Sequence, residues 1–497
     1  MTSLSSFMVL KNFVGGEWRE SRGRRVPDFN PADASEIVAE APASTAAEAA
    51  EAVAAAERAF EGWRHTPAPV RGQILYRVQR RMEEQRDVLA EALTREEGKT
   101  LAESLGEVQR AINVIEFFAG EARRITGETI PSELPNNFCY TIKQPVGPVA
   151  IITPWNFPIA IPIWKIAPAL VSGNTVVFKP ASLTPLTATL IAGIFQDCGL
   201  PPGVLNVVFG GGREVGDTIV KHPAIRAVSF TGSNDVGTAL YQAAAARGIK
   251  CQCEMGGKNP IVILADADLD LAVESTVQGA FGSTGQRCTA TSRAVVVDSI
   301  ADEFLERLEA RTAKLVVGPG MDPKTHIGPS VDDSQMKTVL DYVQIGKSEG
   351  ARLVRGGERL TGNGLDRGHF VNPAIFDRVT PEMRIAQEEI FGPVLSVIRV
   401  PDVARALDVA NGVRYGLSAS VYTNDVSKMF KFVERLDAGI LHVNSPTVGG
   451  EAHIPFGGMK ATGVGLREMG RVAIDFYTEL KVVYVDYTGS ARTGNLY

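Results

Sequence analysis

Residues 227–264 read AVSFTGSNDVGTALYQAAAARGIKCQCEMGGKNPIVIL, and this stretch decides the expected fold. Apolar runs at 227–230, 251–254 and 260–264 predict short strands, because each run is brief and bounded by glycine or polar residues. An alanine-rich segment at 236–246 between the first two runs is long enough for a helix. Strands that alternate with helices indicate a parallel sheet covered by helices.

The same alternation extends in both directions, so we expect an α/β protein with two doubly wound parallel-sheet domains. A hairpin strand at 138–142 and a β-rich tail at 481–487 lie outside this alternation. The tail strand pairs either with another subunit or within the chain. Upstream of the opening stretch we predict strands at 175–178 and 204–208, and helices at 45–63, 70–97, 100–125, 185–198 and 214–221. Downstream we predict helices at 269–281, 300–314, 334–349, 403–411 and 425–436, and strands at 294–297, 370–374, 394–399, 418–422 and 440–443.

Composition excludes several classes of protein. The chain has 497 residues, 44% of them hydrophobic, and a net charge of −6, which argues against binding to nucleic acid or to a membrane surface. No uninterrupted apolar run is long enough to span a membrane, and the N-terminus shows no secretory signal pattern. An odd count of five cysteines is typical of a reducing compartment, so we expect a cytoplasmic protein.

Two patterns suggest a metal site, and we reject both. Cys251 and Cys253 are one residue apart without a second Cys/His pair nearby, which alternation in a strand explains better. Asp266, Asp268 and Asp270 begin like a calcium loop, but the expected glycine and the closing glutamate are absent. We therefore predict no metal.

The segment FGSTGQRCTA at 281–290 offers a candidate nucleophile, Cys288. Its glycines allow a tight bend and a close approach by another molecule. A thiolate is a strong nucleophile, and Arg287 or a base elsewhere in the fold would help to form it. The alternative is a small buried cysteine with no chemical role.

Glu254 and Asn156 are candidates for a base and an oxyanion donor. Glu254 leaves an apolar strand before two glycines, and a glutamate in an apolar setting has a raised pKa suited to a base. Asn156 lies between two prolines after an apolar run, where its amide could donate to a developing oxyanion. A surface glutamate and an asparagine that closes a turn are the structural alternatives.

Two further motifs suit a nucleotide. The segment FTGSNDVG at 230–237 follows a strand and opens a helix, so its free amides suit a pyrophosphate, although it lacks the three-glycine fingerprint. Lys179 ends a buried strand and could reach a ribose hydroxyl or a phosphate. An ordinary helix cap and a solvated lysine explain these segments equally well.

Together these motifs resemble the NAD(P)-dependent aldehyde dehydrogenase superfamily over nearly the whole chain. The order of the motifs carries the resemblance, as does the 34-residue separation of Glu254 and Cys288. The matching segments are PWNFP at 154–158, FTGS at 230–233, Glu254 with GGK at 256–258, GQRC at 285–288, EIFGP at 389–393 and PFGG at 455–458.

The resemblance implies that Cys288 attacks an aldehyde and forms a thiohemiacetal. Asn156 and the Cys288 backbone amide would hold the oxyanion, hydride would pass to the nicotinamide, and Glu254 would activate the water that hydrolyses the thioester. Lys179 completes the implied catalytic set and is also expected at the adenine-side ribose. The implied cofactor residues are Ile152, Thr153, Pro154, Trp155, Lys179, Ser182, Phe230, Gly232, Ser233, Val236, Glu254, Gly256, Glu389 and Phe391.

The expected cofactor is NADP or NAD. Strictly NAD-using members of the family tend to have a glutamate where Ser182 stands, and such an acid would repel a 2′-phosphate. The serine removes this repulsion, so we expect the enzyme to accept NADP.

The implied aldehyde-binding residues are Phe157, Trp164, Arg287 and Phe456. Arginine beside the nucleophile occurs in family members that act on carboxylate-bearing semialdehydes, although Arg287 could equally be structural. We expect a semialdehyde such as α-ketoglutaric semialdehyde, with succinate semialdehyde or a broad aldehyde range as alternatives.

The resemblance also implies domain limits and a homodimer or homotetramer. Residues 1–127 and 149–255 would form a Rossmann-like cofactor domain, residues 256–450 a catalytic domain, and residues 128–148 and 470–497 an oligomerisation element. A thiol hydrolase with His442 or His453 as base is the alternative from another class, but it would leave the cofactor motifs without a role.

Overall fold

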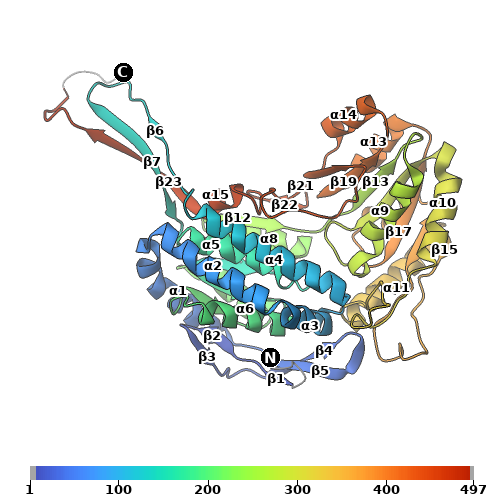
Figure 1. Cartoon of the computed structure of the whole chain (residues 1–497), viewed down its shortest axis with the longest axis horizontal. Helices are drawn as coiled ribbons and strands as arrows, with labels where there is room; N and C mark the ends of the chain where they lie inside the picture. The colour runs from blue at the N-terminus through green and yellow to red at the C-terminus, as the bar shows by residue number, and fades with distance from the viewer. Residues whose placement is uncertain (1–6, 493–497) are drawn as a thin grey trace.

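Two large sheets form the centre of the molecule, as Figure 1 shows for this computed structural model, which describes residues 7–492. The first sheet has eight strands in the order β22-β12-β11-β8-β9-β10-β2-β3, and the second has seven in the order β15-β16-β17-β14-β13-β19-β20. The five inner strands of the first sheet are mutually parallel, and antiparallel strands lie toward its edges. The predicted α/β class with two parallel sheets is confirmed.

The strands of the first sheet are β2 (Asn12–Val14), β3 (Glu17–Arg19), β8 (Val149–Ile152), β9 (Val176–Lys179), β10 (Leu205–Val207), β11 (Ala227–Thr231), β12 (Lys250–Glu254) and β22 (Gly463–Val464). Those of the second are β13 (Asn259–Ile263), β14 (Thr291–Val297), β15 (Arg352–Arg355), β16 (Ala374–Asp377), β17 (Val394–Val400), β19 (Ser418–Tyr422) and β20 (Ile440–Val443). Two smaller sheets contain β1 (Met8–Val9), β4 (Arg25–Asn30) and β5 (Asp33–Pro42), and β18 (Tyr415–Gly416) and β21 (Met459–Lys460).

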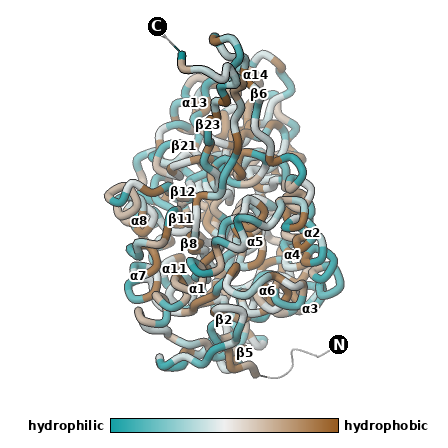
Figure 2. The backbone as a smooth tube through the Cα atoms, turned by 90° about the vertical axis from the view of Figure 1, so that its left-hand side faces the viewer, coloured by the Kyte–Doolittle hydropathy of each residue, from teal (hydrophilic) through white to brown (hydrophobic). Residues whose placement is uncertain are grey.

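Helices cover both faces of each sheet because successive strand residues point to opposite sides. In β8, Val149 and Ile151 join a core with α2, α4, α5 and α6, whereas Ala150 and Ile152 join a core with α1, α7 and α8. Figure 2 shows β8 and β11 between these two layers. These helices and α3 are α1 (Ala46–His65), α2 (Ala68–Glu84), α3 (Arg86–Glu97), α4 (Leu101–Glu121), α5 (Ala160–Val171), α6 (Pro185–Asp197), α7 (Asp217–Lys221) and α8 (Asn234–Ala246).

The second sheet is covered in the same way, with α9 and α10 on one face and α11, α13 and α14 on the other. The remaining helices are α9 (Leu269–Phe281), α10 (Asp298–Thr312), α11 (Asp333–Ser348), α12 (Arg384–Gln387), α13 (Val403–Asn411), α14 (Val426–Arg435) and α15 (Val472–Phe476). Within residues 7–492, no helix is both long and apolar enough to cross a membrane.

A three-stranded antiparallel arm projects from the body beyond the first sheet (Figure 1). It consists of β6 (Thr129–Ile130), β7 (Asn137–Pro145) and β23 (Thr478–Asp486). The predicted hairpin strand and late tail strand therefore pair with each other inside the chain. Several large apolar side chains of the arm are exposed: Ile130, Phe138, Leu480, Val482 and Tyr484.

Two predictions about local structure were wrong, and one helix was not predicted. The helix expected at 70–97 is two helices that separate at Gln85. Helix α5 was not predicted; Pro168 lies inside it, where proline normally breaks a helix, yet every residue of α5 is buried and tertiary packing holds it. The strand expected at 370–374 begins only at Ala374 and continues to Asp377.

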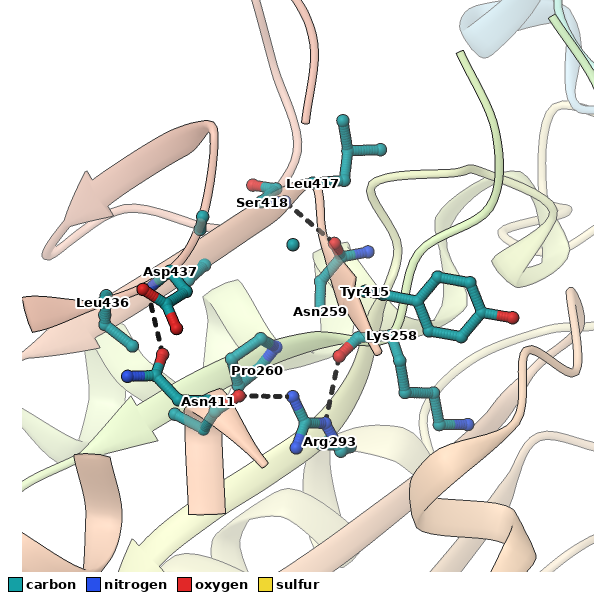
Figure 3. Close-up of a pocket in the computed structure, with 14 residues that line it drawn as sticks. Lys258, Asn259, Pro260, Arg293, Asn411, Tyr415, Leu417, Ser418, Leu436 and Asp437 are labelled. Carbon is teal, nitrogen blue, oxygen red and sulfur yellow. Dashed lines mark hydrogen bonds between the residues drawn. The ribbon is translucent and has the colours of Figure 1, made fainter. Parts of the chain in front are cut away.

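A buried arginine joins two strands of the second sheet to α13. Arg293 on β14 donates from Nε to the Lys258 carbonyl at 3.0 Å, and its two terminal nitrogens donate to the carbonyls of Val409 and Ala410 at 2.8 and 2.9 Å. Figure 3 shows Arg293 and Lys258 beside a cavity of only about 10 Å³. Burial lowers the pKa of Arg293 to about 9.

Replacing this arginine should destabilise the second sheet. We expect Arg293→Met to lower the free energy of unfolding by about 3 kcal/mol, since three buried carbonyls lose their donors. Urea unfolding followed by tryptophan fluorescence measures the change. The exposed pair of Arg307 with Asp270 provides the control, because Arg307→Met should cost less than about 1 kcal/mol. Equal stability of the two variants would contradict the assignment.

Candidate active site

Nine of the predicted site residues line one cavity. A cavity of about 230 Å³ lies between the carboxyl ends of first-sheet strands and the loop that follows α9. The predicted residues among its lining are Pro154, Trp155, Asn156, Gly232, Ser233, Gly256, Cys288, Glu389 and Phe391, and Thr231 belongs to the predicted FTGS motif. Ile161, Met255 and Gln335 complete the lining. Ligands of α/β sheets bind at such carboxyl ends, so the cavity is the candidate active site.

The segment at 281–290 that carries Cys288, called the nucleophile loop below, has an unusual backbone conformation. Ser283 and Thr284 have φ of 48° and 58°, and Gly285 has φ of 67°. A Cβ on Gly285 would lie 2.3 Å from the Gly392 carbonyl oxygen, so only glycine fits there. Three consecutive left-handed residues turn the chain sharply, and Cys288 follows them with its side chain at the cavity wall.

Asn259 fixes the backbone of the nucleophile itself. Its Nδ2 donates to the carbonyls of Cys288 and Ala290 at 2.8 and 2.9 Å. Its Oδ1 accepts from the Ser418 amide at 3.0 Å, a bond that Figure 3 draws. One buried amide thus ties the nucleophile loop to β13 and β19, a role that the sequence did not reveal.

The Cys288 thiol is held in its protonated form. Burial raises its pKa to about 12, together with the nearby charges of Glu254 and Glu389. The charge of Arg110 and a backbone hydrogen bond from Thr289 act in the opposite direction. Because the thiolate is the nucleophile, the protein alone keeps its sulfur unreactive.

Asn156 is anchored by a buried lysine. Lys99 donates to the Asn156 carbonyl at 2.6 Å and to a Glu107 carboxylate oxygen at 2.7 Å, and all three residues are buried. Glu107 also accepts from the amides of Ile159 and Ala160. The Asn156 side chain donates to the Gln286 carbonyl at 2.9 Å, which holds it against the nucleophile loop. The structure therefore brings Asn156 and Cys288 to one cavity.

Glu254 lies at the end of β12, buried behind the cavity wall. Its Oε2 has no hydrogen-bond partner among the described residues. Burial raises the pKa of Glu254 well above its usual value, as does Glu468, whereas Lys165 and Arg467 lower it. A Cβ on Gly457 would lie 2.5 Å from Glu254 Oε1, so the loop packs tightly on the carboxylate. A carboxyl group with a raised pKa is suited to accept a proton.

The opposite end of the cavity carries an aromatic pair and a second buried acid. The rings of Trp155 and Phe391 meet edge to face at 5.4 Å. Glu389 accepts from the Gly257 amide at 2.9 Å, and burial raises its pKa to about 7. A Cβ on Gly256 would lie 2.0 Å from Glu389 Oε2, so this glycine leaves the space that the carboxylate occupies.

The groups expected around the adenine half of a dinucleotide lie at the ends of β8, β9 and β11. Lys179 is buried, and burial lowers its pKa to about 8. Its Nζ donates to the Pro180 carbonyl at 3.1 Å, and Ser182 is exposed in the following turn. At β8, Ile152 is the last strand residue and Thr153 follows it. At β11, Phe230 is buried, and Val236 lies exposed in the first turn of α8.

These groups fit a dinucleotide. The Ser233 side chain makes no cap hydrogen bond to α8, which leaves the amides of the first turn available for a phosphate. Thr231 Oγ1 is buried without a hydrogen-bond partner in the described part of the chain. The Lys179 ammonium, the Glu389 carboxylate and the amides at the start of α8 are the kinds of donors and acceptors that riboses and a pyrophosphate require.

On the other side of Cys288 lie the predicted aldehyde-binding residues. The rings of Trp164 and Phe456 are 5.4 Å apart, and Phe157 lies 4.1 Å under the Lys99 ammonium. Arg287 donates to Ser283 Oγ at 2.7 and 3.0 Å and is paired with Glu103 at 3.4 Å. Its guanidinium is thus engaged within the nucleophile loop.

The sequence did not indicate Lys99, Asn259 or Gln335. Gln335 donates to the carbonyls of Ile390 and Phe391 and holds Phe391 at a φ of 59°. Each of these residues acts through a backbone atom that is distant in sequence, for which no local pattern exists. Asn259 was the most accessible to prediction, because it follows the GGK motif directly.

Comparison with known proteins decides the family. A model described as the aldehyde dehydrogenase family matches residues 18–483. This chain belongs to the aldehyde dehydrogenase family. A Bacillus subtilis relative named alpha-ketoglutaric semialdehyde dehydrogenase is 47% identical over 475 residues, which cover 95% of this chain and 97% of that protein. The 2,5-dioxopentanoate dehydrogenase of Saccharolobus solfataricus is 44% identical, over 96% of this chain and 99% of that protein.

Solved structures of the aldehyde dehydrogenase family share the fold. A betaine aldehyde dehydrogenase from Staphylococcus aureus, solved in complex with NAD+, superimposes with a TM-score of 0.95. It is 35% identical, and the match covers 98% of this chain and 96% of that structure. The predicted family, fold class and enzyme class are therefore confirmed: the protein is an aldehyde-oxidising oxidoreductase with a nicotinamide cofactor.

The raised thiol pKa should be visible in the cofactor-free aldehyde dehydrogenase. Alkylation of Cys288 by iodoacetamide should accelerate about tenfold per pH unit from about pH 7 to about pH 9.5, because the thiolate fraction rises with pH below the pKa. Glu254→Gln removes one cause of the raised thiol pKa, so Cys288 in this variant should react faster than in the unmodified enzyme at each pH. Mass spectrometry measures the labelling, and Cys288→Ser is the control. A plateau near the pKa of a free thiol would contradict this assignment.

Proposed function

We propose that this aldehyde dehydrogenase oxidises a short semialdehyde that carries a carboxylate, with α-ketoglutaric semialdehyde as the first candidate. The observation that carries the proposal is the identity of 44–47%, over 95–96% of the chain, to three relatives named for this substrate. Relatives at 41–42% identity are named malonate-semialdehyde dehydrogenases, and malonate semialdehyde also bears a carboxylate. Succinate semialdehyde and a broad aldehyde range remain the alternatives.

The covalent step belongs to Cys288. Its sulfur bonds to the aldehyde carbon, the thiol proton passes to solvent water, and the carbonyl oxygen becomes an oxyanion. The Asn156 side-chain amide and the Cys288 backbone amide are the proposed donors to this oxyanion. Lys99 and Gln286 hold Asn156 in place, so these donors are oriented before the substrate arrives.

Loss of hydride from the thiohemiacetal carbon leaves a thioester on Cys288. A bound nicotinamide dinucleotide supplies the acceptor for that hydride. Glu254 then takes a proton from water, the resulting hydroxide attacks the thioester carbon, and the carboxylate product leaves as the sulfur is released. The raised pKa of Glu254 supports this role, because a base is most effective when its pKa lies near the working pH.

The cofactor contacts are proposed by position. Glu389 would bind the nicotinamide ribose with Phe391 beside it, and Lys179 the adenine-side ribose. Trp155 and Ser233 would lie along the cofactor. The remaining proposed contacts are Ile152, Thr153, Pro154, Phe230, Gly232, Val236 and Gly256. Phe157, Trp164 and Phe456 would surround the aldehyde, and the bonds of Arg287 to Ser283 and Glu103 favour a structural role for that residue.

Domain limits and assembly follow the same reasoning. We assign residues 1–127 and 149–255 to cofactor binding, 256–450 to catalysis, and 128–148 with 470–497 to oligomerisation. The exposed apolar side chains of the arm support a homodimer or homotetramer. All five cysteines lie in the described residues and are unpaired, which supports a cytoplasmic location.

A kinetic panel tests the substrate assignment. We expect the catalytic efficiency with semialdehydes of four to six carbons to exceed that with benzaldehyde and betaine aldehyde by about 100-fold, because one charge-assisted contact discriminates on this scale. Absorbance of the reduced nicotinamide measures turnover, and Cys288→Ser is the inactive control. Faster turnover of aldehydes without a carboxylate would refute the semialdehyde assignment. Cysteine-dependent hydrolysis without cofactor reduction would favour the thiol hydrolase.

The serine after β9 generates a cofactor prediction. We expect NADP to support catalysis comparably to NAD, and Ser182→Glu to lower the efficiency with NADP by about 100-fold through repulsion of the 2′-phosphate. Ser182→Ala is the matched control and should retain the catalytic efficiency with NADP. Steady-state kinetics with both cofactors at saturating aldehyde measure the ratio. An unmodified enzyme that is orders of magnitude less efficient with NADP would contradict the proposal.

A further inference from the structure

A second arginine lies on the aldehyde side of the nucleophile, and neither its sequence context nor a motif points to it. Arg110 is on α4, with its guanidinium carbon 5.1 Å from the centre of the Trp164 ring. Its Nη2 lies 3.6 Å from the Met469 sulfur. Arg110 also lines a cavity of about 950 Å³, together with Asn113, Phe117, Gly450 and Ala452.

Two donors at this position lack acceptors. Arg110 Nε and Trp164 Nε1 are both buried, and neither has a hydrogen-bond partner among the described residues. No carboxylate in the described part of the chain lies within ion-pair distance of Arg110. The nearest acid along the helix, Glu107, is already paired with Lys99. A buried guanidinium N–H and a buried indole N–H without acceptors are costly, and one carboxylate would satisfy both.

The guanidinium of Arg110 is close enough to Cys288 for its charge to influence the reaction. The charge of Arg110 acts on the Cys288 thiol, and the charge of Cys288 acts on Arg110 in return. Trp164 and Phe456 belong to the apolar cluster against which Cys288 and Phe157 pack. A short aldehyde with its carbonyl carbon at Cys288 would therefore extend along these rings toward Arg110.

The other nearby arginines are less suitable. Arg287 is engaged by Ser283 and Glu103. Arg124 lines the same large cavity, but its side chain is 59% exposed and paired with Glu121 at 2.7 Å. Arg86 also lines this cavity, but among the described residues it is Arg110 whose guanidinium lies over the Trp164 ring. Only Arg110 combines the aromatic contact with a charge that reaches Cys288.

We propose that Arg110, together with the indole N–H of Trp164, binds the carboxylate of the semialdehyde substrate and so determines specificity. This inference rests on the proposed function and names the residues that would perform the recognition. Gly450 leaves room for the guanidinium, since a Cβ there would lie 2.9 Å from Arg110 Nη2. A flexible side-chain end would move away from that methyl group, so position 450 offers a second test that retains the charge.

The test compares α-ketoglutaric semialdehyde with pentanal, an uncharged aldehyde of equal chain length. The quantity measured is the ratio of the two kcat/KM values in the complete enzyme with saturating cofactor. We expect Arg110→Met to lower this ratio about 100-fold, chiefly through KM for the semialdehyde, because a charge-assisted contact is lost. Arg110→Lys should retain part of the preference, since it keeps the charge but not the planar fork. Gly450→Ala should also lower the ratio.

Arg124→Met is the matched control, because it removes the same charge from the same cavity and should leave the ratio unchanged within about threefold. An unmodified enzyme that prefers the semialdehyde, combined with an unchanged ratio in Arg110→Met, would overturn the inference and leave the proposed function intact. Equal losses for both aldehydes would indicate a structural role and also overturn it. No preference in the unmodified enzyme would refute the proposed function itself. If Arg110→Met does not fold, competitive inhibition by α-ketoglutarate is measured for Gly450→Ala and for the unmodified enzyme. An inhibition constant that is the same for both enzymes overturns the inference.

Discussion

The active site depends on one short covalent connection between the two sheets. β12 ends at Glu254 in the first sheet and β13 begins at Asn259 in the second, so only four residues cross between them. β13 pairs with β14, which starts just after Cys288, and Asn259 donates to the Cys288 carbonyl. A carboxylate at one end of this crossing and the nucleophile loop at the other cannot separate without breaking a sheet. The crossing thus converts a separation of 34 residues in sequence into a shared site.

Buried charges reinforce this arrangement from the helical side. Lys99 follows α3, and Glu107 on α4 pairs with it and caps the start of α5 through two backbone amides. The same lysine holds the carbonyl of Asn156. Such a network costs desolvation energy, and Lys99 and Glu107 are each held by several hydrogen bonds, which favours a single geometry. A rigid amide is what oxyanion stabilisation requires.

The sequence predicted much of this architecture because the informative residues were local. The alternation around 227–264 predicted the sheet, and glycines at 256 and 285 marked positions where a Cβ would collide with neighbours. The prediction from sequence failed where tertiary contacts override the local preference of the chain. Packing on all sides holds α5 as a helix despite Pro162 and Pro168. Asn259 and Lys99 act on carbonyls from distant segments, and the choice between Arg110 and Arg287 depends on which guanidinium already has partners. No spacing rule contains that information.

The protonated state of the resting nucleophile also affects how the enzyme ages. Peroxide oxidises thiolates far more readily than thiols, and the first product, a sulfenic acid, leads on to irreversible acids. Burial and two neighbouring carboxylates keep Cys288 in the less vulnerable form. The surroundings that keep this thiol protonated therefore also favour slower oxidation of the sulfur between turnovers.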